Sequence, residues 1–180
     1  MSTSYVIRDL FGGAITAKMP QGLVDASNLR QVPDNQEVFM YDRNNVSIIV
    51  EVLQAVNESE ESKAIGFHFE SLAQDNSAEK AEVQQVDVIP NERGDTTPPA
   101  IILQGTQLVH KFNRKERDTV KVLMALYRVQ DKSIDLVVTF NIPLVTEEGG
   151  AVTEADALQV THDFHEFVRS LKIVNFGLFA

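Results

Sequence analysis

Strand-like patterns dominate the second half of the chain. Residues 101–112 alternate in part between apolar and polar side chains, and residues 120–129 are almost all apolar. A continuous apolar run is typical of a strand that is covered on both faces. Residues 134–142 alternate again, and the short gap 130–133 predicts that they form an antiparallel hairpin with the preceding strand. Pro143 is expected to end this last strand.

The N-terminal part of the chain predicts shorter elements. Gly12 and Gly13 lie between two apolar runs, and glycine readily adopts the positive φ of a tight turn, so we expect a short hairpin there. Residues 36–41 are rich in apolar and aromatic side chains and are expected to form a strand. In residues 47–56 the apolar side chains recur at i, i+3, i+4 and i+7, which predicts a helix capped by Ser47. Their β-branched side chains favour a strand instead.

Two further helices are predicted. Residues 64–73 carry apolar side chains at helical spacing. The clearest helix begins after Thr153, whose side chain can cap it, and Asp156 follows three residues later as in a capping box. The apolar stripe of this helix consists of Val160, Phe164, Phe167, Val168 and Leu171.

Two polar segments are interpreted as loops rather than as domain boundaries. They are residues 74–82 and residues 90–99, and the second contains Gly94 and a pair of prolines, which are turn signals. Neither lies between two self-sufficient apolar halves, so residues 1–180 are predicted to form a single domain. A mostly antiparallel sheet with helices at the start, middle and end is typical of an α+β layered domain. The continuous apolar strands indicate helices on both faces of the sheet.

The charge balance narrows the class of partner. Among 180 residues, 16 Lys and Arg stand against 26 Asp and Glu, which gives a formal net charge of −10. Nucleic acids and anionic membranes are therefore poor partners, whereas basic protein surfaces are favoured. The absence of cysteine excludes disulfides and thiolate chemistry. The N-terminus has no apolar run typical of a signal peptide, and no stretch reaches the ~20 apolar residues of a membrane helix.

Motifs for catalysis or metal binding are weak. His162 and His165 lie three residues apart on a predicted helix, beside Asp163 and Glu166, and this spacing can hold a metal. No second ligand pair is marked, so polar or half-buried helix histidines are the favoured interpretation. Phosphate-loop and nucleophile-elbow motifs are absent from the sequence. The basic cluster is expected to lie in a solvated hairpin loop rather than at a partner contact, and it consists of Lys111, Arg114, Lys115 and Arg117.

The segment 25–37 combines charged residues with interleaved apolar ones. Pro33 presets φ, and Asp34 and Asn35 tolerate turn geometry, so a turn is predicted before the strand 36–41. This turn is expected to present the carboxylates of Asp34 and Glu37 close together. Composition alone favours a capped, solvated turn. A general acid and base is the catalytic alternative for paired carboxylates, but no pocket residues point to it.

Ordered strings of residues across most of the chain resemble one known family. The most specific string is VPDNQEV at 32–38, whereas residues 74–118 match only loosely. Other matching strings are LFGGAI (10–15), DAS (25–27), LR (29–30), SIIVEVL (47–53), FHFE (67–70), LYR (126–128), VTFNIP (138–143) and LFA (178–180). Together they resemble the Mog family of Ran guanine-nucleotide release factors, and a fungal member in particular.

The resemblance implies a fold, a partner and a binding site. The implied fold is an antiparallel sheet of about six strands between helices, an α/β/α sandwich similar to the photosystem II protein PsbP. The implied function is that of a GTPase regulator, not an enzyme: a Ran-binding domain, with no cofactor, that promotes nucleotide release and supports nuclear protein import in the nucleus and also the cytoplasm. A monomer is expected, since no heptad seam is present. The implied Ran-binding residues are Asp34 and Glu37, followed by Asp25, Arg30 and Gln36.

The sequence alone leaves other interpretations of the site and of the function open. Asp25 and Arg30 could simply brace the loop by a charge-assisted bond. A small-ligand or metal-dependent enzyme or carrier would use a cleft beside the sheet, with His162, His165 or the carboxylates. A PsbP-like structural subunit is disfavoured because the sequence shows no transit peptide.

Overall fold

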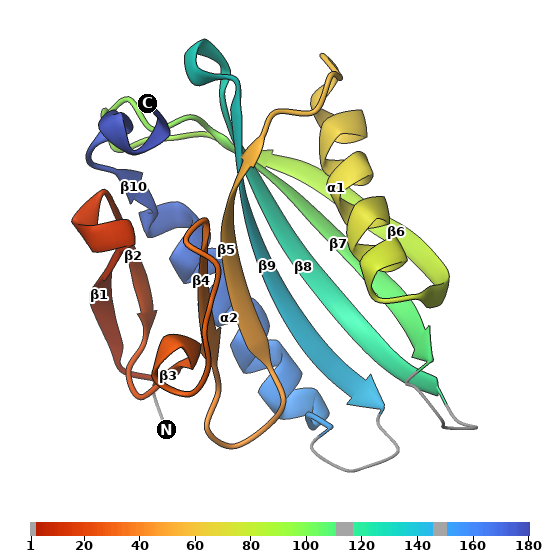
Figure 1. Cartoon of the computed structure of the whole chain (residues 1–180). Helices are drawn as coiled ribbons and strands as arrows, with labels where there is room; N and C mark the ends of the chain where they lie inside the picture. The colour runs from red at the N-terminus through yellow and green to blue at the C-terminus, as the bar shows by residue number, and fades with distance from the viewer. Residues whose placement is uncertain (1–2, 111–116, 146–150) are drawn as a thin grey trace.

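The computed structural model describes residues 3–110, 117–145 and 151–180 (Figure 1). Within these residues the chain forms ten strands, two α-helices and short 3₁₀ turns. The elements are β1 (Tyr5–Leu10), η1 (Phe11–Gly13), β2 (Ile15–Pro20), β3 (Val24–Asp25), η2 (Ala26–Asn28), β4 (Gln36–Met40), β5 (Ser47–Gln54), α1 (Glu61–Asp75), β6 (Ala78–Ile89), β7 (Ala100–His110), β8 (Arg117–Val129), η3 (Gln130–Lys132), β9 (Ile134–Val145), α2 (Glu154–Ser170), β10 (Lys172–Ile173) and η4 (Phe176–Phe179).

The strands form two antiparallel sheets. In the described part of the chain, the large sheet has seven strands in the order β3-β4-β5-β9-β8-β7-β6, and the small one has three in the order β1-β2-β10. The mixed α+β class with a mostly antiparallel sheet is thus confirmed, while the expectation of about six strands was too low. The predicted hairpins are present, with Leu10 opposite Ile15 in β1–β2 and Val129 opposite Ile134 in β8–β9.

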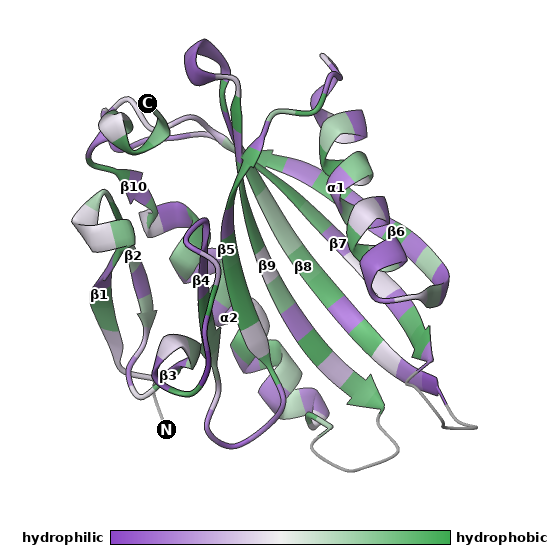
Figure 2. Ribbon diagram, viewed as in Figure 1, coloured by the Kyte–Doolittle hydropathy of each residue, from purple (hydrophilic) through white to green (hydrophobic). Residues whose placement is uncertain are grey.

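Two apolar cores lie against β8, one on each side. Successive residues of a strand point to opposite faces. The even-numbered Val122, Met124 and Leu126 belong to a cluster with Ile65 and Phe69 of α1. The odd-numbered residues belong to a second cluster with α2, which contains Leu123, Ala125, Tyr127, Phe164 and Phe167. Figure 2 shows β9 as mostly hydrophobic, whereas β6, at the edge of the sheet, carries hydrophilic and hydrophobic bands along its length.

The C-terminal helix α2 follows its sequence prediction closely. The side chain of Thr153 accepts a hydrogen bond of 3.1 Å from the backbone N–H of Asp156. The ring of Phe140 on β9 meets those of Phe164 and Phe167 edge to face, with centroids 5.2 and 5.8 Å apart. Such pairs add to the burial of the rings themselves. All residues of the predicted stripe are buried, namely Val160, Phe164, Phe167, Val168 and Leu171.

Three element predictions are wrong. Residues 47–54 form the strand β5 and not a helix, because β4 and β9 pair with it on both sides and Ile48 and Val50 are completely buried. Residues 78–82 belong to β6 and not to a loop. Pro143 does not end β9, which continues to Val145; Pro143 lies opposite Val120, next to a register shift that accommodates its missing N–H.

The remaining expectations concern helices and charges. The predicted helix 64–73 is confirmed as part of α1, and the loop 90–99 is confirmed between β6 and β7. Lys111, Arg114 and Lys115 lie outside the described residues, whereas Arg117 begins β8 and pairs with Glu79. Among the helices of the described residues, none combines the length and the apolar character that a membrane crossing requires.

Candidate functional site

The five residues singled out by sequence lie between Asp25, the last residue of β3, and Glu37, the second residue of β4, along one edge of the large sheet (Figure 1). We call this segment the corner. Asp25 ends β3 and caps the short helix η2. Its Oδ1 accepts hydrogen bonds from the backbone N–H of Ser27 at 2.9 Å and from Ser27 Oγ at 2.7 Å. Asp25 therefore shapes the backbone of the loop.

Arg30 does not brace this loop through its side chain. Its backbone N–H donates to the carbonyl of Ala26 at 3.0 Å, and the residue is exposed. No hydrogen bond or ion pair joins the Arg30 guanidinium to Asp25 in the described part of the chain, so the expected charge-assisted bond between them is wrong. Arg30 remains an exposed cation at the rim of the corner.

The turn before β4 is tightly fixed. The backbone N–H of Gln36 donates to the carbonyl of Pro33 at 3.0 Å, which closes the turn around Asp34 and Asn35. Asn35 then exchanges two hydrogen bonds with the backbone of Val52 on β5, at 2.9 and 3.2 Å. Asp34 is exposed at the tip. The turn therefore presents the carboxylate of Asp34 to solvent from a rigid backbone.

Gln36 and Glu37 begin β4 and are half-buried. The amide of Gln36 donates to Glu51 Oε2 at 2.9 Å. Glu37 Oε1 accepts a hydrogen bond of 2.8 Å from the backbone N–H of Phe11, at the tip of the β1–β2 hairpin. The sequence led us to expect two carboxylates presented together. Only that of Asp34 is exposed, whereas that of Glu37 is partly engaged within the protein.

A buried aspartate of α2, which the sequence offers only as a weak metal candidate, joins this helix to the ends of β1 and β4 that are opposite Phe11 and Glu37. Asp163 of α2 is 1% exposed and accepts hydrogen bonds from the hydroxyls of Tyr5 and Tyr41, both at 2.7 Å, and from Gln159 Nε2 at 2.9 Å. Burial, together with the negative charge of Asp163, raises the pKa of both tyrosines well above the usual value, so they remain donors. Asp163 thereby ties β1 and the end of β4 to α2.

The metal-site hypothesis gains no support from the structure. Among the described residues, no group of three or more His, Asp or Glu side chains is arranged to hold a metal ion. His162 is exposed, 4.0 Å from Glu166, which pairs with Lys18 at 3.4 Å. His165 is half-buried, and burial, followed by the charges of nearby cations, lowers its pKa. His162 and His165 are thus an exposed and a half-buried residue of α2.

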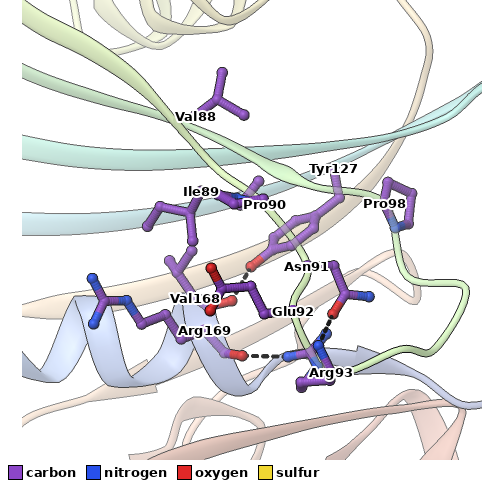
Figure 3. A pocket seen from close by; sticks show the side chains of 11 residues that line it. Val88, Ile89, Pro90, Asn91, Glu92, Arg93, Pro98, Tyr127, Val168 and Arg169 are labelled. Carbon is purple, nitrogen blue, oxygen red and sulfur yellow. Dashed lines mark hydrogen bonds between the residues drawn. The ribbon is translucent and has the colours of Figure 1, made fainter.

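A cavity of about 520 Å³ lies at the other end of α2 (Figure 3). Its polar groups are largely engaged in holding the walls: Tyr127 Oη donates to the carbonyl of Val168 at 2.8 Å, and Arg93 donates to the carbonyl of Arg169. Asn91 and Asp95 bind the loop to itself, and these hydrogen bonds keep the pKa of Asp95 low despite its burial. None of the five candidate residues lines the cavity, so it is separate from the corner.

Comparison with known proteins identifies the family of this chain. The family model described as "Ran-interacting Mog1 protein" matches residues 8–143, which is most of the chain. The chain belongs to the Mog1 family. The match begins within β1 and ends within β9, and it therefore includes both the hairpin tip and the turn of Asp34.

Individual Mog1 relatives are similar over nearly their whole length. The Ran guanine nucleotide release factor of Danio rerio is 36% identical over 181 residues, covering 96% of this chain and 99% of that protein. The nuclear import protein MOG1 of Saccharomyces cerevisiae is 32% identical, covering 96% of this chain and 84% of that protein. The crystal structure of the Saccharomyces cerevisiae Ran-binding protein Mog1p superposes with a TM-score of 0.79 at 31% identity, covering 99% of this chain and all of that one.

Proposed function

We propose that this Mog1-family protein binds the small GTPase Ran and promotes release of its guanine nucleotide, in support of nuclear protein import. The observation that carries the proposal is similarity along almost the entire chain to relatives named as Ran guanine nucleotide release factors and nuclear import proteins. The role is that of a regulator. The finer expectations belong to the same proposal: residues 1–180 act as one Ran-binding domain, as a monomer, in the nucleus and the cytoplasm.

The corner around Asp34 is the proposed contact surface. Asp34, Glu37, Asp25, Arg30 and Gln36 supply it, and the exposed carboxylate of Asp34 pairs with basic side chains of Ran near its nucleotide site. A rigid turn supports this role, because a backbone that is already held in place loses little conformational entropy on binding. The net charge of −10 also favours encounter with a basic surface.

Nucleotide release then follows from linkage between two binding equilibria. If the protein binds nucleotide-free Ran more tightly than loaded Ran, it must weaken nucleotide affinity by the same factor. No bond is made or broken on this route. What the corner has to supply is a contact that competes with the groups on Ran that hold the phosphates.

Release of a fluorescent guanine nucleotide from Ran tests the proposal directly. The wild-type protein should accelerate release, and Asp34→Lys and Glu37→Lys should abolish both release and binding while the domain stays folded. A lost partner in a desolvated charge pair typically costs about 2–5 kcal/mol. The matched control is Asp131→Lys, which reverses an exposed charge on η3, outside the five candidate residues, and should behave as wild type.

Two outcomes would reject parts of this picture. If the wild-type protein neither changes the rate of nucleotide release nor associates with Ran at low ionic strength, the proposed function is wrong. Normal binding by both folded lysine variants would reject the assigned surface. The association rate should also fall as salt is added, because steering by net charge is screened.

A further inference from the structure

The tip of the β1–β2 hairpin has an unusual backbone. Phe11, Gly12 and Gly13 have φ values of 51°, 67° and 93°, so three consecutive residues adopt left-handed conformations. Glycine accepts such values freely, but a bulky side chain such as that of Phe11 does so only when its surroundings impose it. Strained backbone of this kind clusters at functional sites. The contacts of Phe11 therefore indicate what imposes this conformation.

The carboxylate of Glu37 is one of the groups that hold it. Its Oε1 accepts the hydrogen bond from the Phe11 N–H at 2.8 Å, across a sequence separation of 26 residues. The Phe11 carbonyl accepts from the Ala14 N–H at 3.3 Å, and the Phe11 ring packs against the larger core. Arg8 on the same hairpin lies over the ring of Phe39 on β4, 5.5 Å from its centroid. The hairpin and β4 are therefore joined at more than one point.

The tip that results is open to a partner. Gly12 is exposed, and a methyl group added at its Cα would meet no other atom within 4 Å. The exposed Asp9 lies beside the tip, because the same test at Gly13 meets its carboxylate at 3.8 Å. Gly12 therefore offers bare backbone that another protein can approach closely. Gly12 directly follows Phe11, whose N–H binds Glu37, and Glu37 comes three residues after Asp34.

We propose that Glu37 is a positioning residue of the Ran site and that the Gly12 tip is a second contact surface beside the Asp34 turn. The inference rests on the proposed function and assigns different roles to Asp34 and Glu37. Asp34 supplies an exposed charge. Glu37 acts mainly through Phe11, by accepting the hydrogen bond that sets the tip. What Glu37 must retain is therefore an acceptor oxygen rather than a negative charge.

Replacing Glu37 in two ways separates these roles. Glu37→Gln keeps an acceptor for the Phe11 N–H and removes the charge, whereas Glu37→Ala removes both. We expect Glu37→Gln to bind Ran within about threefold of wild type and Glu37→Ala to bind at least tenfold more weakly. Amide hydrogen exchange at Phe11 supplies a readout without Ran, and its protection should be kept in Glu37→Gln and lost in Glu37→Ala. Asp34→Asn should weaken binding without changing exchange at Phe11.

Gly12→Asn tests whether the tip itself touches the partner. Asparagine tolerates left-handed backbone better than most residues, so the tip should keep its shape while gaining an exposed side chain. We expect at least fivefold weaker binding with unchanged protection of Phe11. Asp131→Asn, a neutralised charge on η3, is the control and should bind normally.

The possible failures are distinguishable. If Glu37→Gln binds as weakly as Glu37→Ala while Phe11 stays protected, Glu37 contacts Ran directly and the positioning role is wrong. If Gly12→Asn binds as wild type with the tip intact, the tip is not a contact. Either result leaves the proposed function standing. If the wild-type protein fails to bind Ran, the proposed function fails, and the inferred contact fails with it.

Discussion

Two buried aspartates on different elements hold two different parts of this molecule. Asp135 of β9 is completely buried and meets charged or ionisable partners: His68 Nε2 lies 2.7 Å from Oδ2, and Arg128 Nε donates to Oδ1 at 3.1 Å. Asp163 of α2 is almost as buried, but within the described residues it accepts hydrogen bonds from two tyrosine hydroxyls and one amide. The cost of burying a carboxylate is thus offset by charged or ionisable partners in one region and by neutral donors in the other.

The elements that each aspartate joins explain the difference. Asp135, His68 and Arg128 connect β9, α1 and β8, and Arg128 also donates to the carbonyls of Val56 and Glu58 in the segment that leads to α1. This is the scaffold. Asp163 reaches β1 and the residue after β4, and the other ends of these two strands carry Phe11 and Glu37. One aspartate supports the fold as a whole, and the other supports the candidate corner.

The largest effect is expected from removing Asp135. Asp135→Ala leaves the largely buried guanidinium of Arg128 without its counter-ion, which typically costs about 3–5 kcal/mol of unfolding free energy. Chemical denaturation would measure this loss. Adding Arg128→Met should recover part of it, because the double variant no longer buries an unpaired charge. A double variant no more stable than Asp135→Ala would show that the ion pair is not what Asp135 contributes.

A smaller loss of stability with a larger loss of binding is expected from Asp163→Ala. Its neutral donors lose an acceptor, at a cost of about 1–3 kcal/mol. Because Asp163 anchors the far ends of the two strands that carry Phe11 and Glu37, the variant should also bind Ran more weakly, measured at a temperature where both it and Asp135→Ala are folded. Asp135→Ala should bind as wild type under those conditions. Equal binding by the two variants would contradict the division between scaffold and corner.

The sequence predicted the scaffold better than its edges. The stripe of α2 and the alternation of β9 follow from local periodicity, and both are confirmed. In contrast, β5 has helical spacing, and its strand form comes from pairing with the neighbouring β4 and with β9, which is far away in sequence. Tertiary pairing overrides such local signals. The edge strand β6 was missed because it exposes most of its side chains and therefore lacks an apolar pattern.

The candidate site divides in a similar way. The turn at Asp34 follows from local turn chemistry in the VPDNQEV string, and its position is present in the structure. The hydrogen bond from Phe11 to Glu37 and the two tyrosine hydrogen bonds to Asp163 could not be predicted, because they join residues separated by 26 to 158 positions. Asp135 occupies a polar position of an alternating strand, and its burial by His68 of α1 and by Arg128 depends on contacts that the alternation does not reveal.

Acidic pH is expected to remove the stability that Asp135 contributes. Burial opposes ionisation of Asp135, but hydrogen bonds from His68, the Val56 N–H and Arg128 outweigh it, and the pKa of Asp135 is lowered. The ionised carboxylate therefore contributes stability that is fully present above its unfolded-state pKa of about 3.9 and is lost as the pH falls through the lower folded-state value. Asp135→Asn should be less stable at neutral pH but lose less stability below about pH 4. Parallel acid profiles for the variant and the wild type would contradict this.

The smallest effects are expected from the tyrosines. Tyr5→Phe and Tyr41→Phe each remove one donor to Asp163, and a hydrogen bond of this kind contributes about 0.5–1.5 kcal/mol. Each single variant leaves Asp163 with the other hydroxyl and with Gln159 as donors. The double variant leaves only the amide for a buried carboxylate, so its cost should exceed the sum of the two, as coupled neighbours in one network do. Strictly additive losses in chemical denaturation would mean that Asp163 does not need the pair, and that β1 and the end of β4 are anchored to α2 independently.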